Sequence, residues 1–310
     1  MVLVGRWPAP GQDSMETRWK MRSLLFLPGD SERKLEKGFA SEADTLLIDL
    51  EDSVAPDGKP RARALAAAAI AERRAANPGR IYVRVNDLAS GFLDDDLGAI
   101  VPAGPTGIML PKAVGLADIE HLSARLRVHE AEAGLGDGVL RVLPIMTENA
   151  PGFFAAATFE RGHPRLSGLT WGAEDLSAAI GARASRDEAG RYTDVFRLAR
   201  AATILAASAA EVAAIDTVFV NFRDSQGLRA ECAEAERDGF TGKLAIHPDQ
   251  VAIINEVFTP SAEAVGEARA VIDAFAAAGN PGVVGFGGRM YDRPHLRRAE
   301  RLLARVRPTA

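Results

Sequence analysis

Short apolar segments alternate along the chain with longer, alanine-rich segments in which apolar residues recur at helical spacing. This alternation is typical of β–α units that form a parallel sheet. The clearest predicted helices cover residues 60–76, 116–133, 195–214 and 225–238. Strands are predicted at residues 23–27, 45–50, 81–85, 107–110, 139–145, 166–171, 215–221 and 243–246.

The number and spacing of the strand candidates decide between two α/β architectures. Eight strands separated by helical segments favour a (β/α)8 TIM barrel over an open doubly wound sheet. A dinucleotide-binding sheet has a glycine-rich turn before its first helix, whereas the glycine-dense segment here, 282–288, lies far from the first strand. We therefore predict a barrel domain over residues 21–258.

The two ends of the chain do not follow the barrel pattern. Residues 1–20 are mixed in composition and lack the apolar region of a signal peptide, so we predict a flexible N-terminal extension. Beyond the last strand, residues 261–278 and 295–306 are predicted helices, and residues 279–288 a loop. The tail 259–310 is too short for an ordinary independent domain, and we expect a C-terminal helical lid or arm that packs on a neighbouring subunit.

Composition and charge exclude several classes of function. The 310 residues include 37 Lys+Arg and 42 Asp+Glu, a formal net charge of −5, which argues against nucleic acid as a partner. No apolar run approaches the roughly 20 residues that span a bilayer, so no membrane partner is expected. The single cysteine, Cys232, excludes an internal disulfide and a cysteine-based zinc cluster. These features predict a cytoplasmic protein.

Two carboxylates follow neighbouring predicted strands. In a barrel of this kind the active site lies at the carboxyl ends of the strands. Glu148 follows the fifth strand and Asp175 the sixth, so both can reach one hard cation such as Mg²⁺, which typically takes one or two protein carboxylates. A role as helix N-cap is an equal alternative on position alone, particularly for Asp175.

Basic residues at the strand ends form a second group of candidates. Arg84 lies inside an otherwise apolar strand, where an anionic partner is expected: a substrate carboxylate, or a structural pair with Glu51 or Asp52. Lys112 is either a cation of the site or a structural partner of the same acids. A group of basic side chains flanks the first two strands. They either bind anionic phosphates or form a solvated basic face: Arg22, Arg33, Lys34, Lys37 and Lys59.

Taken together in order, several short motifs resemble one known family. The chain is similar to the citrate lyase beta-subunit-like branch of the HpcH/HpaI aldolase superfamily, which includes malyl-CoA lyase-type enzymes. The likeness runs from about residue 22 to residue 305. It rests on residues 22–30 (RSLLFLPGD), 49–54 (DLEDSV), 83–86 (VRVN), 110–112 (LPK), Glu148, 172–177 (GAEDLS), 242–248 (GKLAIHP) and 290–294 (MYDRP).

The resemblance implies a function for the candidate residues. It implies a homotrimer, or a dimer of trimers, in which Glu148 and Asp175 hold Mg²⁺ and Arg84 binds substrate oxygens. It further implies that Asp292, from a neighbouring subunit's tail, transfers a proton. Glu51 and Asp52 are then expected to order Arg84 and metal-bound water. The implied substrates are short 3-hydroxyacyl-CoA thioesters, whose CoA is expected to contact basic residues that include Arg22, Lys34 and Lys59.

Three alternatives stay open at this stage. The same site can serve a malyl-CoA thioesterase, a CoA-independent aldolase of 2-oxo acids, or a catalytically silent CoA-binding or assembly subunit. Two segments depart from the family pattern: residues 149–151 (NAP) after the glutamate, and residues 221–224 (NFRD), where an acidic residue is common at the first position. These departures bear on the acyl group and the CoA contacts more than on the metal site.

Overall fold

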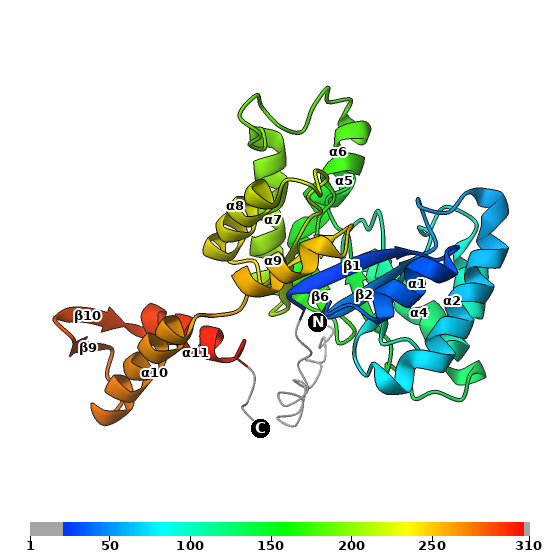
Figure 1. Ribbon diagram of the computed structural model, residues 1–310. Helices are drawn as coiled ribbons and strands as arrows, with labels where there is room; N and C mark the ends of the chain where they lie inside the picture. The colour runs from blue at the N-terminus through cyan, green and yellow to red at the C-terminus, as the bar shows by residue number, and fades with distance from the viewer. Residues whose placement is uncertain (1–20, 307–310) are drawn as a thin grey trace, which may run out of the picture. The chain divides into compact units, whose positions relative to one another are not determined.

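Eight parallel strands form the centre of the protein in the computed structural model, which describes residues 21–306. Their order is β5-β4-β3-β2-β1-β8-β7-β6, as in a barrel opened at one seam. Figure 1 shows β1 and β2 side by side, with helices around the strands. The predicted (β/α)8 barrel is therefore confirmed. The strands are β1 (Ser23–Pro28), β2 (Thr45–Asp49), β3 (Ile81–Arg84), β4 (Gly107–Leu110), β5 (Arg141–Pro144), β6 (Gly168–Leu169), β7 (Ala213–Asp216) and β8 (Gly242–Ala245).

The seam between β5 and β6 closes the ring with few contacts. Isolated parallel bridges join Val142 to Leu166 and Ile145 to Thr170. Backbone hydrogen bonds support them, including one from the Met146 N–H to the Thr170 carbonyl at 2.9 Å. All other neighbouring strands of the barrel pair in continuous ladders.

Helices follow the strands in the order expected for β–α units. Helices α2 and α5 have a proline in the first turn, where its missing N–H is harmless because that position has no intrahelical partner. The helices are α1 (Glu32–Phe39), α2 (Lys59–Arg73), α3 (Leu93–Ile100), α4 (Leu116–Glu132), α5 (Ala150–Ala155), α6 (Ala173–Ile180), α7 (Asp194–Ala209), α8 (Ser225–Asp238) and α9 (Asp249–Val257).

Side chains alternate between the inside of the barrel and the helix layer, because successive residues of a strand point to opposite faces. Leu47 and Tyr82 belong to the buried apolar cluster formed by almost every strand. Asp49 and Arg84 stand two residues further along the same strands and therefore share that face at its carboxyl end. The site described below is thus a continuation of the barrel core.

The opposite face of β7 and β8 carries a buried ion network instead. The Lys243 ammonium, fully buried, lies 2.8 Å from Asp216 and 2.8 Å from Glu231. Arg200 of α7 and the indole N–H of Trp171 also bond to Asp216. Since every charge of the network has an opposite partner, it fixes α7 and α8 against the strands without leaving an isolated buried ion.

Two predicted boundaries are wrong. The helix predicted at 195–214 ends at Ala209, and strand β7 begins at Ala213 rather than at 215. Alanine has the highest helix propensity, so the run up to residue 214 reads as helix. In the structure Glu211 takes a left-handed conformation with φ of 56°, which breaks the helix, and Ala213 pairs with Gly168.

The chain divides into two compact units after Ile254, within α9, whereas the sequence places the boundary after residue 258. The second unit contains α10 (Ala262–Ala277), β9 (Val283–Phe286), β10 (Arg289–Asp292) and α11 (Arg293–Leu303). Its own buried cluster includes Val271, Phe275 and Tyr291.

The loop predicted at 279–288 is wrong at its centre, because β9 lies within it and pairs with β10 in an antiparallel hairpin. The predicted extension 1–20 lies outside the described residues. Within residues 21–306, no helix is both long and apolar enough to cross a membrane.

Candidate active site

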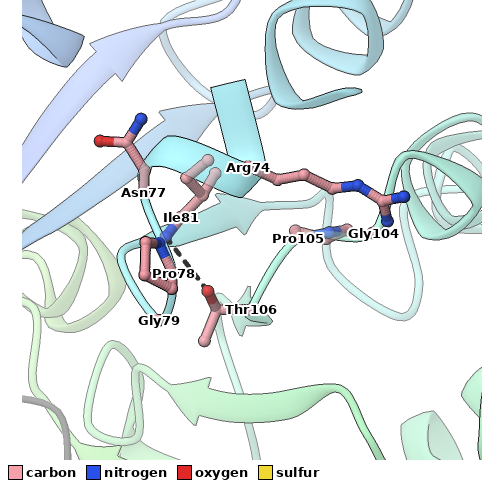
Figure 2. Close-up of a pocket in the computed structure, with 8 residues that line it drawn as sticks. All are labelled: Arg74, Asn77, Pro78, Gly79, Ile81, Gly104, Pro105 and Thr106. Atoms are coloured by element: carbon pink, nitrogen blue, oxygen red, sulfur yellow. Dashed lines mark hydrogen bonds between the residues drawn. The ribbon is translucent and has the colours of Figure 1, made fainter. Parts of the chain in front are cut away.

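A pocket of about 860 Å³ opens at the carboxyl ends of the barrel strands. Its walls bring together Arg84, Glu148 and Asp175, three of the residues that the sequence singled out. A second hollow of about 180 Å³ lies at the amino ends of β3 and β4 (Figure 2). There Thr106 accepts a hydrogen bond from the backbone N–H of Ile81, and no carboxylate lines the space. The first pocket is therefore the candidate active site.

Arg84 is held by acids on β2 and in the loop that follows it. Its guanidinium donates two hydrogen bonds of 2.7 Å to the carboxylate of Asp49 and lies 2.9 Å from Glu51. It also stacks on the ring of Phe26, 4.9 Å from the centroid. The structural pairing expected with Glu51 exists, but the main partner is Asp49. Arg84 is nearly buried and lines the pocket.

Asp49 anchors both Arg84 and the loop after β2. Burial alone would raise the pKa of Asp49, but the hydrogen bonds and charge of Arg84 outweigh it and keep the pKa below its ordinary value. Its carboxylate also accepts the backbone N–H groups of Glu51 at 2.9 Å and Ser53 at 3.1 Å. One residue thus orients both the arginine and the loop that carries Glu51 and Asp52.

Glu51 and Asp52 differ in their surroundings. Glu51 is buried, which raises its pKa despite the positive charges of Arg84 and Lys112. Asp52 is 58% exposed and lies 3.8 Å from Arg84 and 4.0 Å from the Lys112 ammonium. The pair therefore borders the site with one buried and one solvated acid.

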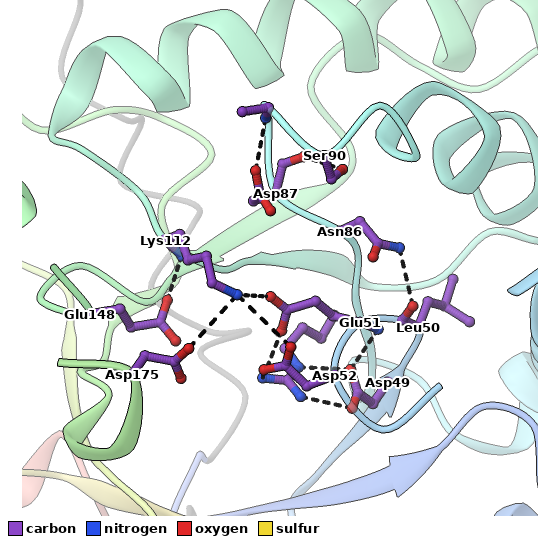
Figure 3. A network of polar contacts seen from close by, with 12 residues as sticks. Asp49, Leu50, Glu51, Asp52, Asn86, Asp87, Ser90, Lys112, Glu148 and Asp175 are labelled. Atoms are coloured by element: carbon purple, nitrogen blue, oxygen red, sulfur yellow. Dashed lines mark hydrogen bonds and ion pairs between the residues drawn. The ribbon is translucent and has the colours of Figure 1, made fainter. Parts of the chain in front are cut away.

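Lys112 connects the acids of both sides of the pocket (Figure 3). Its backbone is left-handed, with φ of 55°, a conformation that is uncommon outside glycine and is found at functional sites. In this conformation its N–H donates to the carboxylate of Glu148. Its ammonium contacts Glu51 and lies 3.8 Å from Asp175. Burial alone would lower the pKa of Lys112, but its acidic partners raise it, so the side chain is charged.

Glu148 and Asp175 lie next to each other on one side of the pocket (Figure 3), and neither caps a helix. Helix α5 is capped by Asn149, whose side chain accepts the Gly152 N–H at 2.7 Å. Helix α6 has Gly172 at its N-cap position, so Asp175 lies inside the first turn with its side chain 32% exposed. The helix-cap alternative therefore does not hold for either carboxylate.

The electrostatics of this pair favour a cation between its members. Burial and the nearby charge of Asp175 raise the pKa of Glu148 well above its ordinary value. Across the cluster, acids outnumber bases by three charges when all are ionised. Its members are the acids Asp49, Glu51, Asp52, Glu148 and Asp175 and the bases Arg84 and Lys112.

The donor set suits a hard divalent ion. Within residues 21–306 no group of three or more Asp, Glu, His or Cys side chains is close enough to enclose a metal. Two carboxylates next to an open pocket match Mg²⁺, which commonly leaves its other positions to water and substrate oxygens. Glu148 and Asp175 are the residues that could hold it.

Of the basic residues proposed for CoA, two are placed elsewhere. Lys59 is buried, and its ammonium donates to the Leu50 and Glu51 carbonyls and to the Asn86 side chain, so it cannot reach a ligand. Arg22 precedes β1 at the opposite end of the barrel and is paired with Asp44 at 2.7 Å.

The other three basic residues line the pocket. Arg33, Lys34 and Lys37 lie on α1, and all three side chains are exposed.

Asp292 belongs to the second unit. It is the last residue of β10 and the N-cap of α11, and its carboxylate lies 2.5 Å from the ring Nδ1 of His295. The hydrogen bond from His295 lowers the pKa of Asp292.

Three contributors were not recognised from the sequence. Asp49 is part of the motif at residues 49–54, but the sequence did not indicate it as the partner of Arg84, although both lie at paired positions of β2 and β3. Asn149 followed by Ala-Pro is a readable helix start, with an N-cap and a proline in the first turn. Gly172 gives Glu148 its space: a Cβ at this position would lie 2.6 Å from Glu148 Cγ. No local sequence signal indicates that contact.

Comparison with known proteins places this fold and site in one family. The HpcH/HpaI aldolase/citrate lyase family model matches residues 22–248. The chain is 35% identical over 293 residues to a (3S)-malyl-CoA thioesterase of Cereibacter sphaeroides, covering 93% of this chain and 95% of the relative. It is 32% identical over 315 residues to the mitochondrial citramalyl-CoA lyase of Rattus norvegicus, covering 97% and 91%.

A solved structure agrees with these relatives. The crystal structure of CitE from Mycobacterium tuberculosis, in complex with magnesium, acetoacetate and coenzyme A, superposes with a TM-score of 0.71 at 33% identity, covering 93% of this chain and 98% of that one. The chain belongs to the HpcH/HpaI aldolase/citrate lyase family, and the resemblance stated above is confirmed. It is an enzyme of the lyase class.

Proposed function

We propose that the protein is a Mg²⁺-dependent carbon–carbon lyase that cleaves, or forms by condensation, a short 3-hydroxyacyl-CoA such as malyl-CoA, methylmalyl-CoA or citramalyl-CoA. The products of cleavage are a 2-oxo acid and an acyl-CoA. One observation carries the proposal: Glu148 and Asp175 lie close together and line the same pocket as Arg84, in a cluster with excess negative charge. The magnesium in the solved CitE complex and the citramalyl-CoA lyase relative support it.

In this proposal Glu148 and Asp175 hold the metal. When bound, Mg²⁺ polarises the hydroxyl and carboxylate oxygens of the substrate and lowers the pKa of the hydroxyl. The protein keeps Glu148 in place through the Lys112 N–H and through the space left by Gly172. Glu51 and Asp52 position Arg84 and Lys112 around the bound substrate.

Arg84 binds the oxygens on which negative charge develops. Burial alone would lower its pKa, but the hydrogen bonds and charge of Asp49 raise it, so the guanidinium stays charged. Because Asp49 and Glu51 fix its orientation before substrate arrives, no reorganisation is needed as charge forms. A general base takes the proton of the hydroxyl, and the electron pair of the carbon–carbon bond then passes to the acyl-CoA fragment, which gives a 2-oxo acid and the enolate of the acyl-CoA.

Asp292 completes the site in this proposal. It comes from the tail of a neighbouring subunit in a homotrimer or a dimer of trimers, and it exchanges a proton with the α-carbon of the acyl-CoA. The exposed side chains of Arg33, Lys34 and Lys37 on α1 take the anionic phosphates of CoA.

A second candidate function is hydrolysis of the same thioester. The 35% identity to a (3S)-malyl-CoA thioesterase favours it as specifically as the lyase relative favours cleavage. The two activities differ in their products: a thioesterase releases free CoA, whereas a lyase releases acetyl-CoA or propionyl-CoA.

The deciding experiment is product analysis over the three thioesters named above, with Mg²⁺ and with EDTA. We expect Mg²⁺-dependent formation of a 2-oxo acid and an acyl-CoA, abolished by Glu148→Ala and by Asp175→Ala. Free CoA as the sole CoA product would show that the protein is a thioesterase and not a lyase. Turnover that is unaffected by EDTA or by both substitutions would overturn the metal mechanism.

A further inference from the structure

The second unit contains a close pair of acid and base outside the barrel. The carboxylate Oδ1 of Asp292 lies 2.5 Å from Nδ1 of His295, and the two side chains are 49% and 40% exposed. The backbone N–H of His295 also points to the same oxygen at 3.4 Å. The hydrogen bond with the histidine lowers the pKa of Asp292. The backbone N–H of Asp292 also points to Nδ1 at 3.3 Å, so Nδ1 accepts this bond in the neutral ring and donates to the carboxylate in the imidazolium.

Other charges near the pair are directed elsewhere. Arg289 of β10 faces Glu267 of α10 at 3.9 Å, and Arg293 donates to a backbone carbonyl just after α10. The ring of Tyr291 meets His295 edge-on, with 5.5 Å between centroids. Among residues 21–306, the basic side chain that the structure places on the Asp292 carboxylate is thus that of His295.

The proposed cleavage raises a question of proton supply. The enolate needs a proton at its α-carbon, yet an aspartate with an ordinary pKa near 3.9 is protonated in only about one molecule in a thousand at pH 7. The lowered pKa of Asp292 makes that fraction smaller still. Histidine side chains, in contrast, generally titrate near neutrality and hold a substantial proton population there.

We propose that His295 is a positioning residue that stores the proton which Asp292 delivers to the substrate, a role that rests on the proposed function. In cleavage, the imidazolium gives its Nδ1 proton to the Asp292 carboxylate. The carboxyl passes a proton to the α-carbon, where the electron pair of the enolate forms the new C–H bond. Asp292 ends ionised, and the neutral imidazole regains a proton from water.

Condensation runs the same relay backwards. The proton leaves the α-carbon of the acyl-CoA for Asp292 and then reaches a neutral imidazole. Cleavage therefore needs the protonated pair and condensation the unprotonated pair. A rise in pH therefore lowers the cleavage rate and raises the condensation rate.

A purely structural role predicts something different. Asp292 and His295 form a capping box at the start of α11. Glutamine also serves at this third helical position of a capping box. The substitution His295→Gln therefore preserves the helix cap and removes only the titrating ring, and an equal thermal midpoint for both proteins verifies the fold.

The experiment measures kcat against pH in both directions for the full-length assembled enzyme with saturating Mg²⁺. We expect His295→Gln to lose the histidine limb in both directions and to slow cleavage at pH 7 by about 10²-fold, as for general acid–base groups. We further expect imidazole in the buffer to restore part of the rate of His295→Ala. A His295→Gln enzyme with the parental kcat and pH profile, or a His295→Ala enzyme unresponsive to imidazole, would overturn the inference.

Asp292→Ala separates this inference from the function beneath it. If Asp292→Ala slows turnover while His295→Gln does not, the relay is wrong and the proposed function stands. If neither substitution slows an active enzyme, the role of Asp292 fails as well. If none of the three thioesters is cleaved, the proposed function fails, and the relay falls with it.

Discussion

Replacing Gly172 with alanine should weaken metal binding while leaving the fold intact. The backbone at this position has φ of −124° and ψ of 111°, which alanine adopts without strain. The added Cβ, however, would lie 2.6 Å from Glu148 Cγ and 3.0 Å from its Oε1. Carbon atoms pack at about 3.5–4.0 Å, so Glu148 must move by roughly 1 Å.

The size of the effect follows from that displacement. Overpacking a buried position typically costs about 1–3 kcal/mol, which a domain of this size tolerates. Mg²⁺ demands near-ideal octahedral geometry, so a carboxylate displaced by roughly 1 Å no longer fits its coordination shell. Changes to groups that orient a metal ligand weaken binding by about 10- to 100-fold, and we expect a loss in this range.

Isothermal titration with Mg²⁺ measures this directly, without any assumption about the substrate. Gly98→Ala is the matched control, because its Cβ meets nothing closer than 4.0 Å on the exposed side of α3. We expect the control to bind Mg²⁺ like the parent. A Gly172→Ala protein with parental Mg²⁺ affinity would refute the placement of Glu148 in the metal shell.

Three further predictions concern the charges around the barrel. Lys59→Met should lower the free energy of unfolding by about 2–4 kcal/mol in urea, because it leaves buried acceptors without a donor. Lys34→Ala should instead raise KM for a CoA thioester by about two- to fivefold at unchanged urea midpoint, and high salt should diminish the difference. Burial alone would raise the pKa of Asp216, but the charges of Lys243 and Arg200 outweigh it and lower the pKa. The ionised carboxylate therefore stabilises the fold fully above pH about 4, and this stabilisation is lost as the pH falls below that value. The urea midpoint of Asp216→Asn should therefore change less between pH 6 and pH 3 than that of the parent.

The barrel was predictable because its signal repeats eight times along the chain. Where a segment carried two competing signals, the prediction failed. The alanines at the start of β7 favour helix intrinsically, and only their pairing with β6 makes them strand. The hairpin of the second unit, in contrast, left a readable trace: Gly287 and Gly288 both have positive φ and separate two short β-rich runs, as in a two-residue hairpin turn.

The site was predictable as a set of positions but not as a set of contacts. Strand order brought Arg84, Glu148 and Asp175 to one pocket, and Arg22 could have been excluded on the same grounds, since it precedes β1. The burial of Lys59 could not be predicted, because it depends on three acceptors that only the packed structure brings to its ammonium.

The short seam between β5 and β6 gives the two carboxylates a mechanical role. Glu148 follows one side of the seam and Asp175 follows the other, at the place where the barrel ring is joined by isolated bridges. A ligand held by both residues would link β5 to β6 across the seam, in addition to the isolated bridges. Opening of the barrel at this point and escape of the ligand then become a single event, so that amide exchange along the seam reports occupancy of the pocket.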